Sequence, residues 1–172
     1  IININENVVF ANNGNVVVCF KGTLPEIYSL SEKDFEDMHG AWFQAIKTLP
    51  TGCVIHKQDV YLKQKYTSQE LPNTTFLEKA THEHFKGREY IEHHSYLFFV
   101  LTKNNALNNS KFVNPLRDVS KQVIRDSDET VASFISAVSD AVSFLNNSRK
   151  VHYTSIDAKA IHNFTNTYFN GF

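Results

Sequence analysis

The strongest chemical signal in this sequence is a group of histidines near the middle of the chain, His82, His84, His93 and His94, with glutamates between them. Imidazole and carboxylate groups are the ligands that zinc and iron take in many enzymes. On a helix, however, His82 and His84 point about 200° apart, and on a strand His93 and His94 point to opposite faces. A metal would therefore need ligands from elsewhere in the chain. We interpret the group as surface histidines in a polar linker, and we keep a small stand-alone metal-dependent enzyme that uses the His82–His94 region as the alternative.

A second polar group interrupts a strand-like run at His56, Lys57, Gln58 and Asp59. His56 and Asp59 are the residue types of a general base and its carboxylate partner. Alternation along a strand places them on opposite faces, which argues against catalysis there. The pattern favours a buried polar network or a subunit contact. Together with Trp42, these four residues are the candidate interaction or polar-network residues.

Trp42 lies on the apolar stripe of a predicted helix. Helical spacing of that kind favours a place in the core. Exposure beside Tyr28 or Phe43 would instead make Trp42 an interface anchor.

The familiar catalytic motifs are absent from the sequence. No glycine precedes Lys-Ser or Lys-Thr, which excludes a phosphate-binding loop, and there is no Gly-x-Ser-x-Gly elbow. Cys19 and Cys53 sit in apolar runs without a thiolate-activating neighbour, which is typical of reduced core residues. A disulfide between neighbouring strands is left open. We therefore predict no catalytic residue, no cofactor and no metal ligand in this segment.

Composition bounds the class of protein. A chain of 172 residues, 42% hydrophobic and 13% aromatic, predicts a single globular domain over residues 1–172. A net charge of -1 gives no positive electrostatic field to attract a nucleic-acid backbone, so no direct nucleic-acid binding is expected. Binding of single-stranded DNA through exposed aromatic residues is a further alternative. No apolar run reaches the roughly 18 residues of a membrane span. The first residue is Ile1 rather than Met, which suggests a segment of a longer chain.

Hydrophobic periodicity predicts strands and helices in alternation. Asn-Gly at 13–14 predicts a hairpin with a type I′ turn. The polar segment 103–127 is interpreted as a short helix or a mobile arm, and Asp126 as the cap of the helix that follows. The other predicted elements are strands at 8–11, 16–21, 53–65, 95–102 and 151–154 and helices at 31–49, 75–85, 126–145 and 157–169.

Three helices carry apolar stripes that we expect to face the core. The stripes consist of Phe35, Met38, Trp42, Ala45, Ile46 and Leu49 in the first helix, Val131, Phe134, Ile135, Val138, Ala141, Val142 and Leu145 in the long helix, and Ile161, Phe164 and Tyr168 in the last. The predicted fold class is α+β, with a mixed, largely antiparallel sheet of about four or five strands packed by about four helices in a single domain.

A long run of short motifs extends over much of the chain, from about residue 8 to residue 105. The motifs are Phe20-Lys21, Leu24-Pro25-Glu26-Ile27, Leu30-Ser31-Glu32, Asp34-Phe35-Glu36, His39, Trp42, Ala45-Ile46-Lys47, Leu49-Pro50, Ile55-His56-Lys57-Gln58-Asp59, Tyr96-Leu97-Phe98-Phe99 and Leu101-Thr102-Lys103. No single motif is diagnostic, but in this order and spacing the run resembles the N-terminal region of TraG-family conjugation ATPases from Bacteroides-type conjugative transposons.

The resemblance implies a parent protein that is a motor ATPase of a type IV secretion system and energises conjugative DNA transfer. In that family the ATP and magnesium sites lie in a C-terminal motor domain, which is absent from this segment, and no position here matches a catalytic residue. The N-terminal domain is understood as a non-catalytic docking module. The resemblance therefore implies partners among the conjugation subunits at the inner membrane and oligomerisation through the full-length protein. It also implies a cytoplasmic, peripheral location at the inner face of the cytoplasmic membrane.

Overall fold

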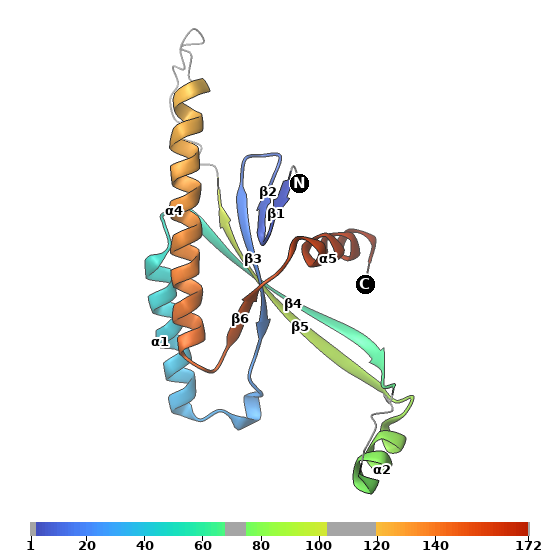
Figure 1. Cartoon of the computed structure of the whole chain (residues 1–172). Helices are drawn as coiled ribbons and strands as arrows, with labels where there is room; N and C mark the ends of the chain where they lie inside the picture. Colours follow the sequence, from blue (N-terminus) through green and yellow to red (C-terminus); the bar gives the residue numbers. More distant parts are fainter. Residues whose placement is uncertain (1–2, 68–74, 103–119, 172) are drawn as a thin grey trace.

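The fold is built on a six-stranded sheet (Figure 1), in a computed structural model that describes residues 3–67, 75–102 and 120–171. Strands follow the order β1-β2-β3-β5-β4, and β6 pairs with the second half of β3. Every pairing between described strands is antiparallel, so the predicted α+β class is confirmed and the sheet is antiparallel rather than mixed. The strands are β1 (Asn3–Asn5), β2 (Val8–Phe10), β3 (Val16–Thr23), β4 (Cys53–Lys65), β5 (Glu89–Leu101) and β6 (His152–Ser155).

Helices cover the two faces of the sheet unequally. Helices α1 and α4 pack against each other and bury one face, whereas α5 covers part of the other (Figure 1). Ser31 caps α1 and Thr75 caps α2, each through a capping box with the acidic residue three positions later. The helices are the 3₁₀ turn η1 (Ile27–Ser29), α1 (Glu32–Thr48), α2 (Phe76–Phe85), α4 (Ser120–Asn147) and α5 (Ala158–Asn170).

The first hairpin forms where Asn-Gly predicted it, but with a different turn. Only Gly14 has a positive φ, at 82°, and its N–H donates to the Ala11 carbonyl at 2.9 Å. The Ala11 N–H in turn donates to the Asn15 carbonyl at 3.0 Å. The loop is therefore a tight turn closed by a left-handed glycine, because the connection has one residue more than a type I′ turn needs.

Strands β4 and β5 form an arm that extends beyond the helix layers. They pair without interruption from Cys53 opposite Leu101 to Lys65 opposite Glu89, and helix α2 sits at the far end (Figure 1). The sequence predicted β5 only from Ser95, with a polar linker before it. That prediction was wrong because the polar residues 89–94 gain a complete hydrogen-bonded ladder with β4, which outweighs their weak strand preference.

Only part of the apolar stripe predicted for α1 faces the core. Ala45 is buried and Trp42 is half-buried, but Phe35 and Ile46 are 48% and 54% exposed. At 100° per residue, Phe35 and Ile46 lie about 80° and 100° round the helix from Ala45, so they fall outside the arc that meets α4 and the sheet.

The two C-terminal helices agree with the sequence in their packing but not in every boundary. All the residues of the long stripe are buried or half-buried. The helix begins by Ser120, however, so Asp126 lies inside it and is not a cap; no glycine or proline follows Ser120 to end a helix there. Tyr168, predicted to point inward, is exposed. Of the predicted segment 103–127, residues 103–119 lie outside the described residues.

Both cysteines are free, and they lie on opposite faces of the sheet. Cys19 belongs to the cluster under α5, and Cys53 packs with the cluster under α1 and α4. They therefore cannot form the disulfide that the sequence left open. Within the described ranges, none of the helices has the length and hydropathy that crossing a bilayer requires.

Candidate functional site

A polar cluster lies where the arm leaves the body, on the face of the sheet that α1 and α4 cover further in. Strand register places Asp59 directly opposite Ser95 and Tyr61 opposite His93. Residues two apart on a strand share a face, so Lys57 joins this group. The structure thus brings together two predicted site residues, Lys57 and Asp59, with two strand partners that the sequence did not identify.

Asp59 is the centre of the cluster. One carboxylate oxygen pairs with the ammonium group of Lys57, and the other lies 3.0 Å from His93 Nε2. Desolvation alone would raise the pKa of Asp59, but hydrogen bonds with Lys57 and His93, together with the nearby Ser95 hydroxyl, lower it to about 2. Asp59 is therefore ionised at neutral pH and joins β4 to β5 at this point.

Ser95 is the buried member of the cluster, with 2% of its surface exposed. Its hydroxyl has no well-formed hydrogen bond to any described group. We attribute its effect on the pKa of Asp59 to proximity rather than to an aligned bond.

Tyr153 and Trp42 close the inner side of the cluster. Gly22 of β3 lies opposite both Ser95 and Tyr153, and the Tyr153 ring lies across it. The Trp42 ring meets Tyr153 edge-on at 6.3 Å. Burial, with a smaller effect of the Asp59 charge, raises the pKa of Tyr153 to about 12, so its phenol stays neutral. Trp42 is half-buried and packs against the core, on the side that its helical spacing predicted.

This arrangement links β4 to β5, and its residues are not in the order in which a base activates a nucleophile. Asp59 stands between Ser95 and His93, whereas a catalytic triad needs the imidazole next to the hydroxyl. His93 is stacked on Tyr61 at 4.6 Å, and the Lys57 amine is engaged by Asp59. The geometry favours a polar network at Lys57 and Asp59, but one that is largely open to solvent, because Ser95 is its only buried member.

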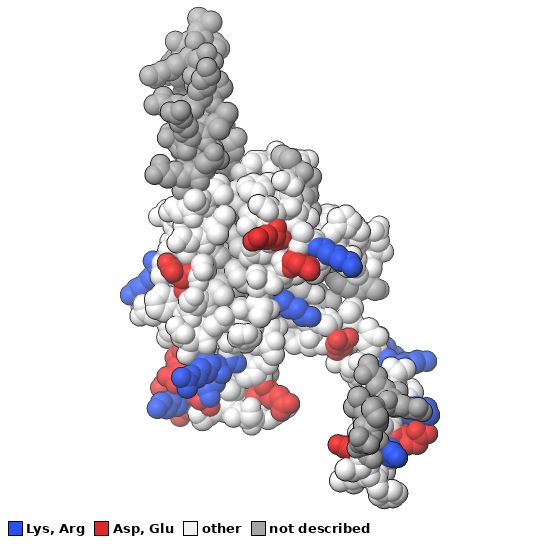
Figure 2. Space-filling view, in the orientation of Figure 1, with Lys and Arg blue, Asp and Glu red and all other residues white. Residues whose placement is uncertain are grey.

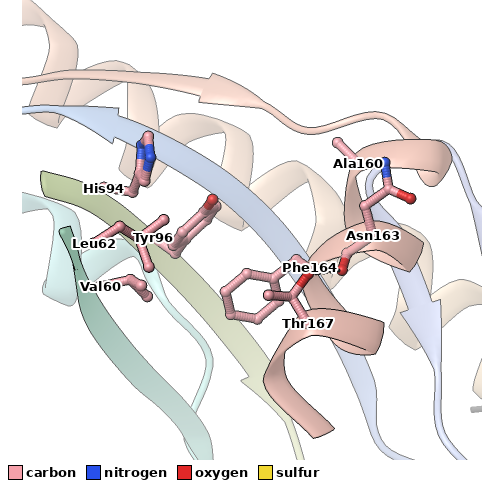
Figure 3. A pocket seen from close by; sticks show the side chains of 8 residues that line it. All are labelled: Val60, Leu62, His94, Tyr96, Ala160, Asn163, Phe164 and Thr167. Carbon is pink, nitrogen blue, oxygen red and sulfur yellow. Dashed lines mark hydrogen bonds between the residues drawn. The ribbon is translucent and has the colours of Figure 1, made fainter. Parts of the chain in front are cut away.

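The other two predicted site residues, His56 and Gln58, lie on the opposite face, as strand alternation predicted. His56 meets the Phe98 ring edge-on at 5.9 Å. Further out on this face, a cavity of about 290 Å³ separates β4 and β5 from α5 (Figure 3). It is lined by Val60, Leu62, His94, Tyr96, Ala160, Asn163, Phe164 and Thr167.

Aromatic rings largely determine the shape of this cavity. Figure 3 shows Phe164 reaching from α5 toward Tyr96, and their ring centroids are 4.5 Å apart. His94 is the cavity's ionisable lining residue besides Tyr96, and its Nε2 lies 3.3 Å from Glu92. Sequence reasoning missed the cavity because nothing local in 157–169 shows which strands α5 covers.

The four histidines of the sequence signal do not come together in one site among the described residues. His82 bonds to the hydroxyl of Tyr66 and stacks on its ring, which fastens α2 to the end of the arm. His93 and His94 point to opposite faces, as predicted. Among the residues that the structure describes, no three His, Cys, Asp or Glu side chains are placed to hold a metal ion.

Surface charge is mixed rather than segregated. Figure 2 shows basic and acidic side chains side by side at the lower end of α1 and at the tip of the arm. Defined pairs account for part of this, including Lys150 with Asp34 at 2.7 Å and Lys63 with Glu89 at 2.6 Å. The face in view therefore offers no continuous basic track for a nucleic-acid backbone.

Comparison with known proteins gives a family match over part of the chain. Residues 1–40 match a family described as "Domain of unknown function, B. Theta Gene description (DUF3875)". The match covers the β1–β3 meander and the first half of α1. No curated protein matches the chain.

Proposed function

We propose that this chain is a non-catalytic docking domain of a conjugative-transfer ATPase of a type IV secretion system, and that the β4–β5 arm is the part that engages the partner subunits. The observation that carries the docking role is the arm itself, two paired strands of 13 residues that run past the helix layers. The family of the parent protein rests on the sequence resemblance. The match of residues 1–40 to a Bacteroides gene description is consistent with it at a coarser level.

The arm carries large apolar side chains that the chain itself leaves in solvent. Phe76 and Leu77 on α2 are 87% and 75% exposed, and Tyr61 and Ile91 on the strands are also exposed. Side chains of this kind are enriched in the centres of protein interfaces. A projecting hairpin with an apolar tip suits contact with another protein better than it suits enclosure of a substrate.

The edge of the sheet supports the same role. β4 pairs only with β5, so its outer backbone edge is unpaired among the described residues. An open edge can accept an additional strand. Lys57, Lys63 and Lys65 along β4 are the kind of charged residue that discourages indiscriminate pairing at an edge.

The experiment removes the tip without disturbing the ladder. The backbones of Tyr66 and Gly87 are joined by a hydrogen bond of 2.9 Å, from the Gly87 N–H to the Tyr66 carbonyl. Replacing residues 67–86 by Asn-Gly should therefore leave a normal hairpin. We expect conjugative transfer by the full-length protein to fall to background while the melting of the isolated domain is unchanged. Transfer at the wild-type rate would contradict the proposal.

A photo-crosslinking residue identifies the partner. Placed at Leu77 or Ile91 in the full-length protein, it should capture the same cytoplasmic-face secretion subunit, whereas the exposed Lys159 on α5 serves as the matched control. Capture from Lys159 alone would assign docking to another surface. In addition, residues 1–172 should neither bind nor hydrolyse ATP, and saturable nucleotide binding would contradict the non-catalytic role.

A further inference from the structure

Helix α1 has a second apolar stripe, on a side that meets neither α4 nor the sheet. Phe35, Phe43 and Ile46 are 48%, 53% and 54% exposed, and exposed His39 lies between them. At 100° per residue these four side chains fall within about 80° of the helix circumference. They form one continuous strip along the helix, which we call the α1 outer strip.

The α1 outer strip has two carboxylates at its N-terminal end and one amine at its C-terminal end, where Lys47 Nζ lies 4.1 Å from the centroid of the Phe43 ring. Glu32 and Glu36 project from the same side of the helix, and in the described part of the chain neither has an ion-pair partner. Asp34, by contrast, is held by Lys150. The helix dipole accounts for an acidic residue in the first turn, such as Glu32, but its influence has faded by Glu36, one turn further on.

Gly40 adds a third observation. It lies inside the helix, where glycine costs about 1 kcal/mol relative to alanine. A Cβ at Gly40 would meet no described atom within 4 Å, so packing inside this chain gives no reason for the missing side chain. Its position beside the α1 outer strip would let another backbone approach closely.

We propose that the α1 outer strip binds an amphipathic helix of another protein, with apolar residues against Phe35, Phe43 and Ile46 and basic residues against Glu32 and Glu36. Exposed apolar anchors at helical spacing are the requirement for packing one helix on another. The unpaired carboxylates select a basic partner and disfavour an anionic lipid surface. This inference holds whichever parent protein the domain belongs to.

The test uses two labelled helical peptides of about 18 residues, matched in length to α1. One has leucines on one face and lysines elsewhere, and the other has glutamates in place of the lysines. Fluorescence anisotropy should show binding of the leucine–lysine peptide only. Phe43→Ser with Ile46→Ser should weaken it at least about tenfold. The matched control, Phe76→Ser with Leu77→Ser on α2, should leave it unchanged.

Charge and access are tested by separate variants. Glu32→Gln with Glu36→Gln should weaken binding and reduce its dependence on NaCl between about 50 and 500 mM, whereas Asp37→Asn, on the other side of α1, should do neither. Gly40→Gln should weaken binding without lowering the melting temperature, since space is open around it. This variant keeps the test valid if the serine pair unfolds the domain.

Three outcomes would overturn the proposal. The first is failure of the leucine–lysine peptide to bind, or equal binding of both peptides. The second is a concentration-dependent dimer that Phe43→Ser with Ile46→Ser abolishes, because the strip would then be occupied by a second copy of this chain. The third is binding to vesicles of phosphatidylcholine and phosphatidylglycerol that the same variant abolishes.

Discussion

Adding one methyl group at two different glycines should change the stability of the domain in opposite directions. A Cβ at Gly22 would lie 2.6 Å from Tyr153 Cε1 and 3.0 Å from its Cδ1. Carbon atoms in favourable contact are about 3.5–4.0 Å apart, so the ring would have to move by about 1 Å. The ring is 3% exposed and Trp42 lies against it, so it has little room. Gly22 has no positive φ, and its backbone therefore presents no further obstacle.

The size of the effect follows from two opposing contributions. Overpacking a buried site costs about 1–3 kcal/mol. Replacing glycine by alanine restricts the unfolded chain, which returns about 0.4–1 kcal/mol. Gly22→Ala should therefore lower the free energy of unfolding by about 1–2 kcal/mol, or the melting temperature by roughly 2–8 °C. Gly40→Ala, the matched control in open space, should raise the free energy of unfolding by about 1 kcal/mol.

Urea and thermal unfolding followed by circular dichroism measure both variants. A double-mutant cycle then locates the cause: in the Tyr153→Leu background, which lacks the Cε1 and Cζ atoms, Gly22→Ala should cost less than in the wild type. If Gly22→Ala were as stable as the wild type, or equally destabilising in both backgrounds, the packing of Tyr153 over β3 would be refuted.

Further predictions concern titration, capping and thiol access. The pKa of Asp59 is lowered to about 2 in the folded state, so its contribution is complete above its ordinary pKa near 4 and is lost as pH falls from about 4 to about 2. In Asp59→Asn, the free energy of unfolding measured with urea should change less between about pH 4 and about pH 2 than it does in the wild type. The difference should be no more than about 1 kcal/mol, because solvent screens the partly exposed Asp59 side chain. Ser31→Ala should cost about 1 kcal/mol of global stability, and an unchanged urea midpoint would contradict the cap. Thr75→Ala should instead speed amide exchange in α2 alone, because α2 buries no residue in the core. Burial raises the pKa of the Cys19 thiol to about 12 and also raises the pKa of the less buried Cys53. A thiol reagent at neutral pH should therefore react slowly with both cysteines, and faster with Cys53 than with Cys19. Faster reaction of Cys19 would be inconsistent with the positions of the two thiols.

Several elements could be predicted because their causes are local. Helices were predicted to begin at Ser31 and at Thr75, and each of these residues caps the helix that follows it. Strand 53–65 was predicted with its observed ends. Gly52, with φ 87°, forms the turn between α1 and this strand, and glycine is the residue that adopts a positive φ most easily.

The candidate site could be predicted only in part. Alternation separated His56 from Asp59 correctly, because the side-chain period of a strand is fixed at two. Alternation within a strand could not identify His93 and Ser95 as the neighbours of Asp59 on β5. Those contacts depend on the register between strands that are more than thirty positions apart in the chain.

The sequence by itself determined the types and faces of most elements, since capping, turn chemistry and hydrophobic period act within a few residues. Only the tertiary structure decided which faces are covered. Phe35 and Ile46 belong to the same helical periodicity as the buried Ala45, yet they stay exposed because α4 and the sheet occupy a limited arc around α1. In the same way, residues 89–94 became strand because β4 provided a complete ladder for them. Burial and strand pairing depend on residues that are distant in the sequence and meet only in the folded protein, so a local stretch of sequence does not determine them.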